Sequence, residues 1–153
     1  MVSKTSRILG ELKQLVSQLS AQEKELLIVA LTEKDSIPVS IFSTKLSGLE
    51  AISLYLNTEE KKSVKQIATV LNRNKNTIYT SLNAAQRKKV KFPTKSKTNI
   101  PLSIFANRKF SILESLVVYL KETKGMTLKA ISEMTNKHYS TIKTTHWRYQ
   151  KKC

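Results

Sequence analysis

The chain has 153 residues and a formal charge of +16, from 27 basic and 11 acidic side chains. This surplus points to a polyanionic partner, most commonly nucleic acid, and the length allows one domain or two small ones but no large core. No long apolar run favours a membrane, and the single cysteine, Cys153, excludes an internal disulfide. Residues 1–5 lead into an amphipathic helix rather than a signal peptide, so we expect a cytoplasmic, nucleoid-associated protein.

Residues 1–36 predict a helical hairpin. Five apolar side chains in residues 4–19 recur at helical spacing: Ile8, Leu12, Leu15, Val16 and Leu19. Ser20-x-x-Glu23 then predicts a capping box that opens a second helix, which runs through about Leu31. The segment has five basic and five acidic groups. Two helices cannot bury their apolar stripe alone, so it would pack on the first repeat described below or pair with another chain as a homodimer, and both alternatives stay open.

Residues 37–88 and 100–152 are two copies of one sequence. With Lys109 as a single insertion, 18 of 52 aligned pairs are identical. A likeness of this size at a fixed register indicates two modules of one fold. The basic excess of the chain lies in these copies and in the segment between them, which supports a role for both copies in binding a polyanion.

Each copy predicts the same order of elements. It opens with Ile-Pro-x-Ser-Ile-Phe, an extended or turn segment, and a helix follows, from about Ser47 to Asn57 in the first copy. A short helix then starts at Ser63 or Thr127, both good N-cap residues. After a three-residue polar turn comes a longer helix whose inner face would carry Ile78, Leu82 and Ala85, or Ile142, Thr145 and Tyr149. A short helix, a tight turn and a longer helix make the helix-turn-helix pattern.

Residues 63–79 and 127–143 resemble the helix-turn-helix family typified by the fourth region of bacterial sigma factors and by related archaeal and phage regulators. The resemblance implies that Ile67 and Ala68 pack the two helices together and that Ile78 anchors the recognition helix. The second copy has Ser132 in place of Ala68 and a threonine in place of Leu71, so we expect weaker packing or a weaker grip on DNA there.

The turn of that family usually contains a glycine, whereas this chain has Asn72 in one copy and Asn136 in the other. Asparagine tolerates left-handed backbone geometry better than other non-glycine residues do. We therefore expect the same turn in both copies.

The longer helix of each copy predicts a polar face opposite its apolar one. In the first copy this face consists of Lys75, Asn76, Tyr79, Thr80 and Asn83, and in the second of Tyr139, Ser140, Lys143, Thr144 and Trp147. Asparagine can bond adenine, lysine can reach guanine, and threonine or tyrosine can meet a phosphate or a thymine methyl. The basic residues expected to meet phosphates are Lys65, Arg73, Arg87, Lys88, Lys129, Lys137 and Lys151. A merely solvated face is the alternative for one such helix, and the repeat, the charge and the turn together favour DNA contact.

Between the copies, Lys89–Asn99 has four lysines, one proline and no helical stripe, and the linker proper is expected at 91–99. The 11 residues of the segment 89–99 reach roughly 36 Å when extended and roughly 18 Å as a coil. This range is compatible with two modules in successive major grooves, about 34 Å apart. A solvated spacer is the alternative reading of its lysines.

Nothing in the sequence indicates an enzyme or a cofactor. A glycine-rich phosphate loop, a nucleophile elbow and a trio of acids for metal-dependent strand cleavage are all missing from the sequence. His138 and His146 have no cysteine or acidic partners at ligand spacing, so we expect no metal site. Trp147 and Tyr149 could stack on bases, although one of them is expected to seal the core of the second module instead.

We therefore predict an all-α protein, with an N-terminal helical segment at 1–36 followed by two tandem helix-turn-helix domains, at 37–90 and 100–153. Its expected function is sequence-specific binding of double-stranded DNA, as a transcription regulator or a sigma-like factor, which would make RNA polymerase a further partner. Two unlike modules predict an asymmetric site of two dissimilar halves with no need for a palindrome. The alternatives are a DNA-architectural or mobile-element accessory protein, and a protein-interaction adaptor.

Overall fold

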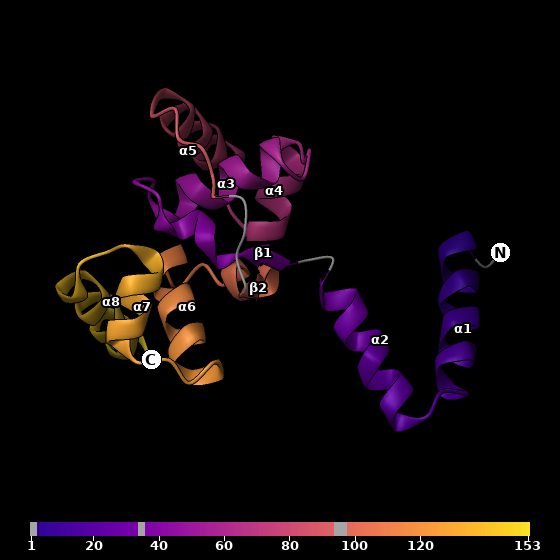
Figure 1. Cartoon of the computed structure of the whole chain (residues 1–153). Coiled ribbons are helices and arrows are strands. Elements are labelled where there is room, and N and C mark those ends of the chain that lie inside the picture. The colour runs from indigo at the N-terminus through magenta and orange to yellow at the C-terminus, as the bar shows by residue number, and fades with distance from the viewer. Residues whose placement is uncertain (1–2, 34–35, 94–97) are drawn as a thin grey trace. The chain divides into compact units, whose positions relative to one another are not determined.

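The computed structural model of the chain describes residues 3–33, 36–93 and 98–153, and these are mostly helical (Figure 1). The prediction of an all-α protein is confirmed at this level. The chain divides into two compact units, Met1–Asp35 and Ser36–Cys153. Two of the linker lysines, Lys95 and Lys97, lie outside the described residues.

The first unit contains α1 (Lys4–Ser17) and α2 (Ala21–Glu33). The predicted capping box is present, since Glu23 N–H donates to Ser20 Oγ at 3.2 Å and Ser20 N–H donates to Glu23 Oε2 at 2.7 Å. These bonds favour the ionised carboxylate, so the pKa of Glu23 is lowered. Helix α1 has no buried residue, and its apolar side chains stay about half exposed.

The second unit contains both copies of the repeat. The first copy forms β1 (Ser36–Pro38), η1 (Val39–Ser43), α3 (Gly48–Thr58), α4 (Val64–Leu71) and α5 (Lys75–Arg87). The second copy forms β2 (Asn99–Pro101), η2 (Leu102–Ala106), α6 (Ile112–Val118), η3 (Tyr119–Thr123), α7 (Leu128–Thr135) and α8 (Tyr139–Lys152). Element for element the copies agree, except that α6 passes into the wider π-type turn of η3 where α3 stays regular.

Hydroxyl side chains begin equivalent helices in the two copies. Ser63 and Thr127 cap α4 and α7 as predicted, each accepting the N–H of the residue three positions later. Both short helices end at an asparagine with left-handed backbone, Asn72 at φ 52° and Asn136 at φ 50°. The expectation that asparagine supports the same turn in both copies is thus confirmed.

An approximate twofold axis relates the two copies, and we call it the pseudo-dyad. Strands β1 and β2 pair antiparallel with Ile37 opposite Ile100, which are equivalent positions of the repeat. The rings of Phe42 and Phe105, also equivalent, lie 5.8 Å apart between centroids. A residue meets its own counterpart only where a twofold axis passes close by, so these pairs locate the pseudo-dyad.

Each copy covers the short helix of the other. Segment η1 packs on α7, and η2 packs on α4. Hydrogen bonds add to this exchange, because Asn72 Nδ2 donates to the Ala106 carbonyl at 3.1 Å and Arg73 donates to the Phe110 carbonyl at 3.2 Å. The apolar side chains of both copies therefore belong to one continuous core.

This arrangement differs from the two linked domains that the sequence predicted. Modules of about 50 residues bury little surface and are only marginally stable alone, and sharing one core enlarges the buried surface of both copies. The segment after α5 is also more than a spacer, because the Phe92 ring packs edge-on against Tyr55 with centroids 5.8 Å apart. The three-residue strands were not predicted, since neither has enough residues to show alternation.

Gly48 and Ile112 test the packing at the pseudo-dyad, where these equivalent positions also meet. A Cβ on Gly48 would lie 3.0 Å from both Cβ and Cγ2 of Ile112. We expect Gly48→Ala to lower the free energy of unfolding by about 1 kcal/mol, since overpacking outweighs the gain from removing a helical glycine. Urea denaturation measures this.

The same change in an Ile112→Ala background is the control, because the shorter side chain removes Cγ2 from the contact. Gly48→Ala should cost less there, which is a positive coupling in a double-mutant cycle. Equal costs in both backgrounds would show that the two positions do not meet.

Candidate nucleic-acid interface

Helix α5 buries an apolar stripe, α8 buries Ile142 and Thr145, and each helix exposes the opposite face. Ile78 and Ile142 are fully buried, and the other predicted inner residues of α5, Leu82 and Ala85, are buried with them. All ten residues predicted for the polar faces are exposed: Lys75, Asn76, Tyr79, Thr80, Asn83, Tyr139, Ser140, Lys143, Thr144 and Trp147. Figure 1 shows α5 at the top of the second unit and α8 at its lower left. The sequence pattern thus identified which side of each helix meets solvent.

The two exposed faces carry lysine and tyrosine in opposite order. Helix α5 has Lys75 followed one turn later by Tyr79, and α8 has Tyr139 followed one turn later by Lys143. The phenol rings are solvent-accessible, with Tyr79 56% and Tyr139 50% exposed. The equivalent positions therefore offer different hydrogen-bonding groups in the two copies.

Two aromatic residues near the C-terminus have different surroundings. Tyr149 packs on Phe110 with ring centroids 4.3 Å apart, so it is the one that seals the second copy. Trp147 is 52% exposed on α8, and the Lys151 ammonium lies 4.2 Å from the centroid of its ring. Trp147 is thus presented on the same exposed face as Lys143.

Most of the predicted phosphate-binding cations are exposed, namely Lys65, Arg87, Lys88, Lys129 and Lys151. Arg73 is partly buried and donates to the carbonyls of Leu71 at 3.0 Å and Phe110 at 3.2 Å. Burial, together with the charge of Arg108, lowers the pKa of Arg73. Part of the hydrogen-bonding capacity of this guanidinium is therefore used in joining the copies, a role that the sequence did not indicate.

Lys137 occupies the position of Arg73 in the second copy. Its ammonium makes no hydrogen bond or ion pair with any residue that the structure describes. Partial burial lowers the pKa of Lys137. A partly desolvated ammonium without an internal partner among the described residues is well suited to bind an external anion.

The same ion pair ties the end of the long helix to the first helix in both copies. Lys88 Nζ lies 2.7 Å from Glu50 Oε2, and Lys152 Nζ lies 2.8 Å from Glu114 Oε2. Lys88 was predicted to meet a phosphate, and in the structure its charge is already balanced by a carboxylate. Lys88 thus links the end of α5 to α3.

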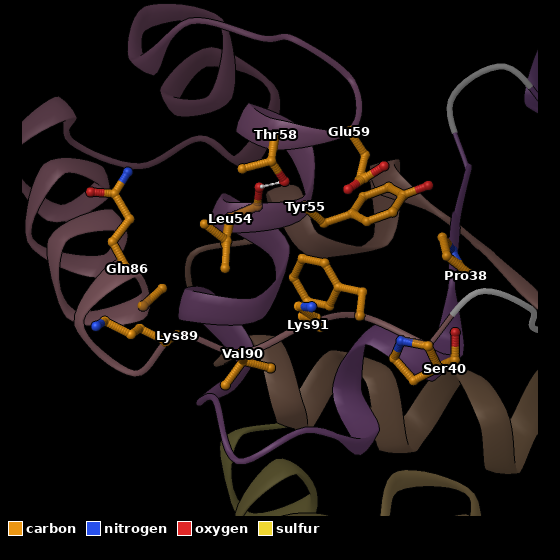
Figure 2. Close-up of a pocket in the computed structure, with 13 residues that line it drawn as sticks. Pro38, Ser40, Leu54, Tyr55, Thr58, Glu59, Gln86, Lys89, Val90 and Lys91 are labelled. Atoms are coloured by element: carbon orange, nitrogen blue, oxygen red, sulfur yellow. Dashed lines mark hydrogen bonds between the residues drawn. The ribbon is translucent and has the colours of Figure 1, made fainter.

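A pocket of about 610 Å³ lies between α3 and the segment that follows α5 (Figure 2). Leu54, Tyr55 and Glu59 line one side, and Val90 and Lys91 belong to the opposite segment. Burial raises the pKa of Tyr55, and the charges of Glu60 and Glu59 raise it further. The polar groups of the pocket do not converge on one point in Figure 2, so we assign it no ligand.

Two other kinds of site were searched within the described residues. No group of three or more histidine, cysteine, aspartate or glutamate side chains there could hold a metal ion. No helix in the described ranges is long and apolar enough to cross a membrane. The exposed faces of α5 and α8 therefore remain the strongest candidate site.

The two equivalent ion pairs differ in burial, which leads to a prediction. The Glu114 side chain is only 6% exposed, against 16% for Glu50. We expect Lys152→Ala to cost about 1–3 kcal/mol of unfolding free energy, because it leaves a buried carboxylate without its cation. Lys88→Ala should cost about 0–1 kcal/mol, as for exposed pairs. Urea denaturation of both variants provides the comparison.

Lys151→Ala is the matched control, since Lys151 neighbours Lys152 on α8 and contacts a ring instead of a carboxylate. Its cost should stay within about 0.5 kcal/mol. Equal losses for Lys88→Ala and Lys152→Ala would contradict the role given to burial.

Comparisons with known proteins add no relative of this chain. No protein-family model matches it, and neither a curated protein nor a solved structure does.

Proposed function

We propose that the chain binds specific sequences of double-stranded DNA, with α4–α5 and α7–α8 acting as two helix-turn-helix pairs. In each pair the longer helix, α5 or α8, is the recognition helix. The observation that carries the proposal is that both copies bury one face of this helix, which contains Ile78 or Ile142, and expose the complete predicted polar face. In both copies a short helix and a left-handed asparagine turn precede the longer helix that carries this face.

The exposed residue types support readout of base edges. Asn76 can bond adenine in bidentate fashion, and Lys75 or Lys143 can reach the acceptors of guanine. Thr80 and Thr144 occupy the same position of the two helices and offer a methyl group to thymine. Because the other four positions of the face differ between copies, the two helices would read different sequences.

Phosphate contacts would supply much of the affinity. The charge of +16 and the exposed Lys65 and Lys129, which lie in the first turn of α4 and α7, favour this. If six to ten cations meet phosphates, affinity should fall by about 10³–10⁵ between roughly 50 and 200 mM salt. The proposed biological role is that of a transcription regulator or sigma-like factor, with RNA polymerase as a further partner.

Selection from a random duplex library at about 150 mM salt tests the proposal. We expect one bipartite motif, with one half blurred by Asn76→Ala and the other by Thr144→Ala, since each change removes a base contact from one helix. Thr123→Ala, an exposed threonine outside both helices, is the control and should leave the motif unchanged.

Lys65→Ala should weaken all sequences alike and reduce the salt slope by about one. If the library yields no motif and the variants do not affect binding, base readout is absent, and a backbone-binding architectural protein is the better account.

The proposal also assigns a partner to the first unit, namely a second copy of the same unit. Ile8, Leu12, Leu15 and Leu19 of this unit follow the spacing of a coiled-coil seam, and the first three are 47–60% exposed. Five basic and five acidic groups make residues 1–36 neutral, so two copies would not repel each other as the basic repeats would. Dimerisation would double the DNA site.

Sedimentation of the full chain measures this association. We expect a dimer, and we expect Leu12→Glu with Leu15→Glu to give a monomer, because buried carboxylates in the seam would lose their hydration. Gln14→Glu adds a charge beside the seam and should leave the dimer intact. A wild-type monomer throughout a broad concentration range would refute the assignment.

A further inference from the structure

The pseudo-dyad relates not only the cores of the two copies but also their recognition helices. Ile37 with Ile100, Phe42 with Phe105, and Gly48 with its counterpart in α6 are three pairs of equivalent residues that meet each other. One twofold axis must pass near all three pairs. Because α5 and α8 belong to the same copies, the same axis exchanges them.

A groove of about 420 Å³ lies at this axis, and both copies line it. Its lining contains four equivalent pairs: Ser47 with Ser111, Gly48 with Ile112, Leu49 with Leu113, and Arg73 with Lys137. Arg73 precedes the first residue of α5 by two positions, and Lys137 precedes the first residue of α8 by two positions. Thr141, in the first turn of α8, also lines the groove. Both recognition helices therefore begin beside the groove.

From this common start the two helices diverge. Figure 1 shows α5 leading to the top of the second unit and α8 lying at its lower left. The N-terminal ends of the two helices are thus near the groove, while Lys88 and Lys152 at their C-terminal ends pair with Glu50 of α3 and Glu114 of α6. Helices exchanged by a twofold axis present their residues in opposite directions along a line that crosses the axis at a right angle.

The charge of the groove suits a duplex that crosses it. Arg73 and Lys137 supply cations from opposite copies, and no acidic residue is among the described residues that line the groove. The ammonium of Lys137 has no internal partner among the described residues. Phosphates of the two strands between the half-sites would meet these cations.

We propose that the two half-sites are inverted with respect to each other, around a centre that faces the groove of Arg73 and Lys137. The target is then an imperfect palindrome, with dissimilar halves because the two faces differ. This inference rests on the proposed DNA binding and replaces the expectation that no palindrome is needed. It also requires a fixed spacing between the halves, because one core, and not a linker, holds the two helices.

A symmetrised variant separates inverted from direct half-sites. Four substitutions give α5 the exposed face of α8: Lys75→Tyr, Asn76→Ser, Tyr79→Lys and Asn83→Trp. Thr80 already matches Thr144. All four positions are exposed, so the core is untouched, and thermal melting checks that the fold is retained. The converse variant gives α8 the face of α5 through Tyr139→Lys, Ser140→Asn, Lys143→Tyr and Trp147→Asn.

The half-site read by α8, taken from the motif of the wild-type protein, is then placed twice in one duplex, as an inverted or a direct repeat at every spacing. The symmetrised variant should bind the best inverted repeat about tenfold or more tighter than the best direct repeat. The converse variant should likewise bind the best inverted repeat of the half-site read by α5 more tightly than the best direct repeat of that half-site. For the favoured duplex, one added base pair between the halves should remove the advantage.

The outcomes distinguish this inference from the function on which it rests. A preference of the folded variants for direct repeats, or equal binding of both orientations, would overturn the inverted arrangement while leaving sequence-specific binding intact. Equal binding at every spacing between the two half-sites would also overturn the inverted arrangement and leave sequence-specific binding intact. Failure of the wild-type protein to enrich any motif would instead refute the proposed function and the inference with it.

Discussion

The antiparallel pairing of Ile37 with Ile100 is the contact on which the arrangement of the second unit depends. Both side chains are fully buried, and each three-residue strand finds in the other the partner for its backbone groups. This pairing brings η1 against α7 and η2 against α4, so neither short helix is covered by its own copy alone. Loss of the pairing would expose the apolar faces of both copies at once, and we therefore regard residues 36–153 as one folding unit.

Within this unit the packing of the core follows the pseudo-dyad, whereas the exposed residues of the two copies differ. Some positions that pack near the pseudo-dyad or under α5 and α8 are identical in the two copies, as in Phe42 with Phe105 and Ile78 with Ile142, while Gly48 meets a larger residue, Ile112. On the exposed faces of α5 and α8, by contrast, one of the five positions is shared, Thr80 with its counterpart in α8. Twofold packing restricts the buried residues to pairs that fit each other, and it leaves the exposed ones free to differ. Two different exposed faces can thus be held in one fixed geometry.

Local features were predictable from the sequence because their causes are local. The capping residues Ser63 and Thr127 set the start of α4 and α7, and Asn72 sets the end of α4. The association of the two copies was not predictable, because Ile37 pairs with a residue far along the chain and a repeat does not reveal whether its copies touch. The bonds of Arg73 were hidden for another reason, since a backbone carbonyl such as that of Phe110 has no sequence signature.

Arginine and lysine at the equivalent positions 73 and 137 make the groove on the pseudo-dyad chemically asymmetric. The guanidinium of Arg73 donates from two nitrogens to two carbonyls, so its plane is fixed, and its remaining N–H groups keep a defined direction. Lys137 has a single flexible ammonium without an internal partner among the described residues. A phosphate on one side of the centre would therefore meet a rigid donor, and one on the other side a mobile charge. Orientation of an imperfect palindrome on this protein would then be favoured at the centre as well as by the two recognition helices.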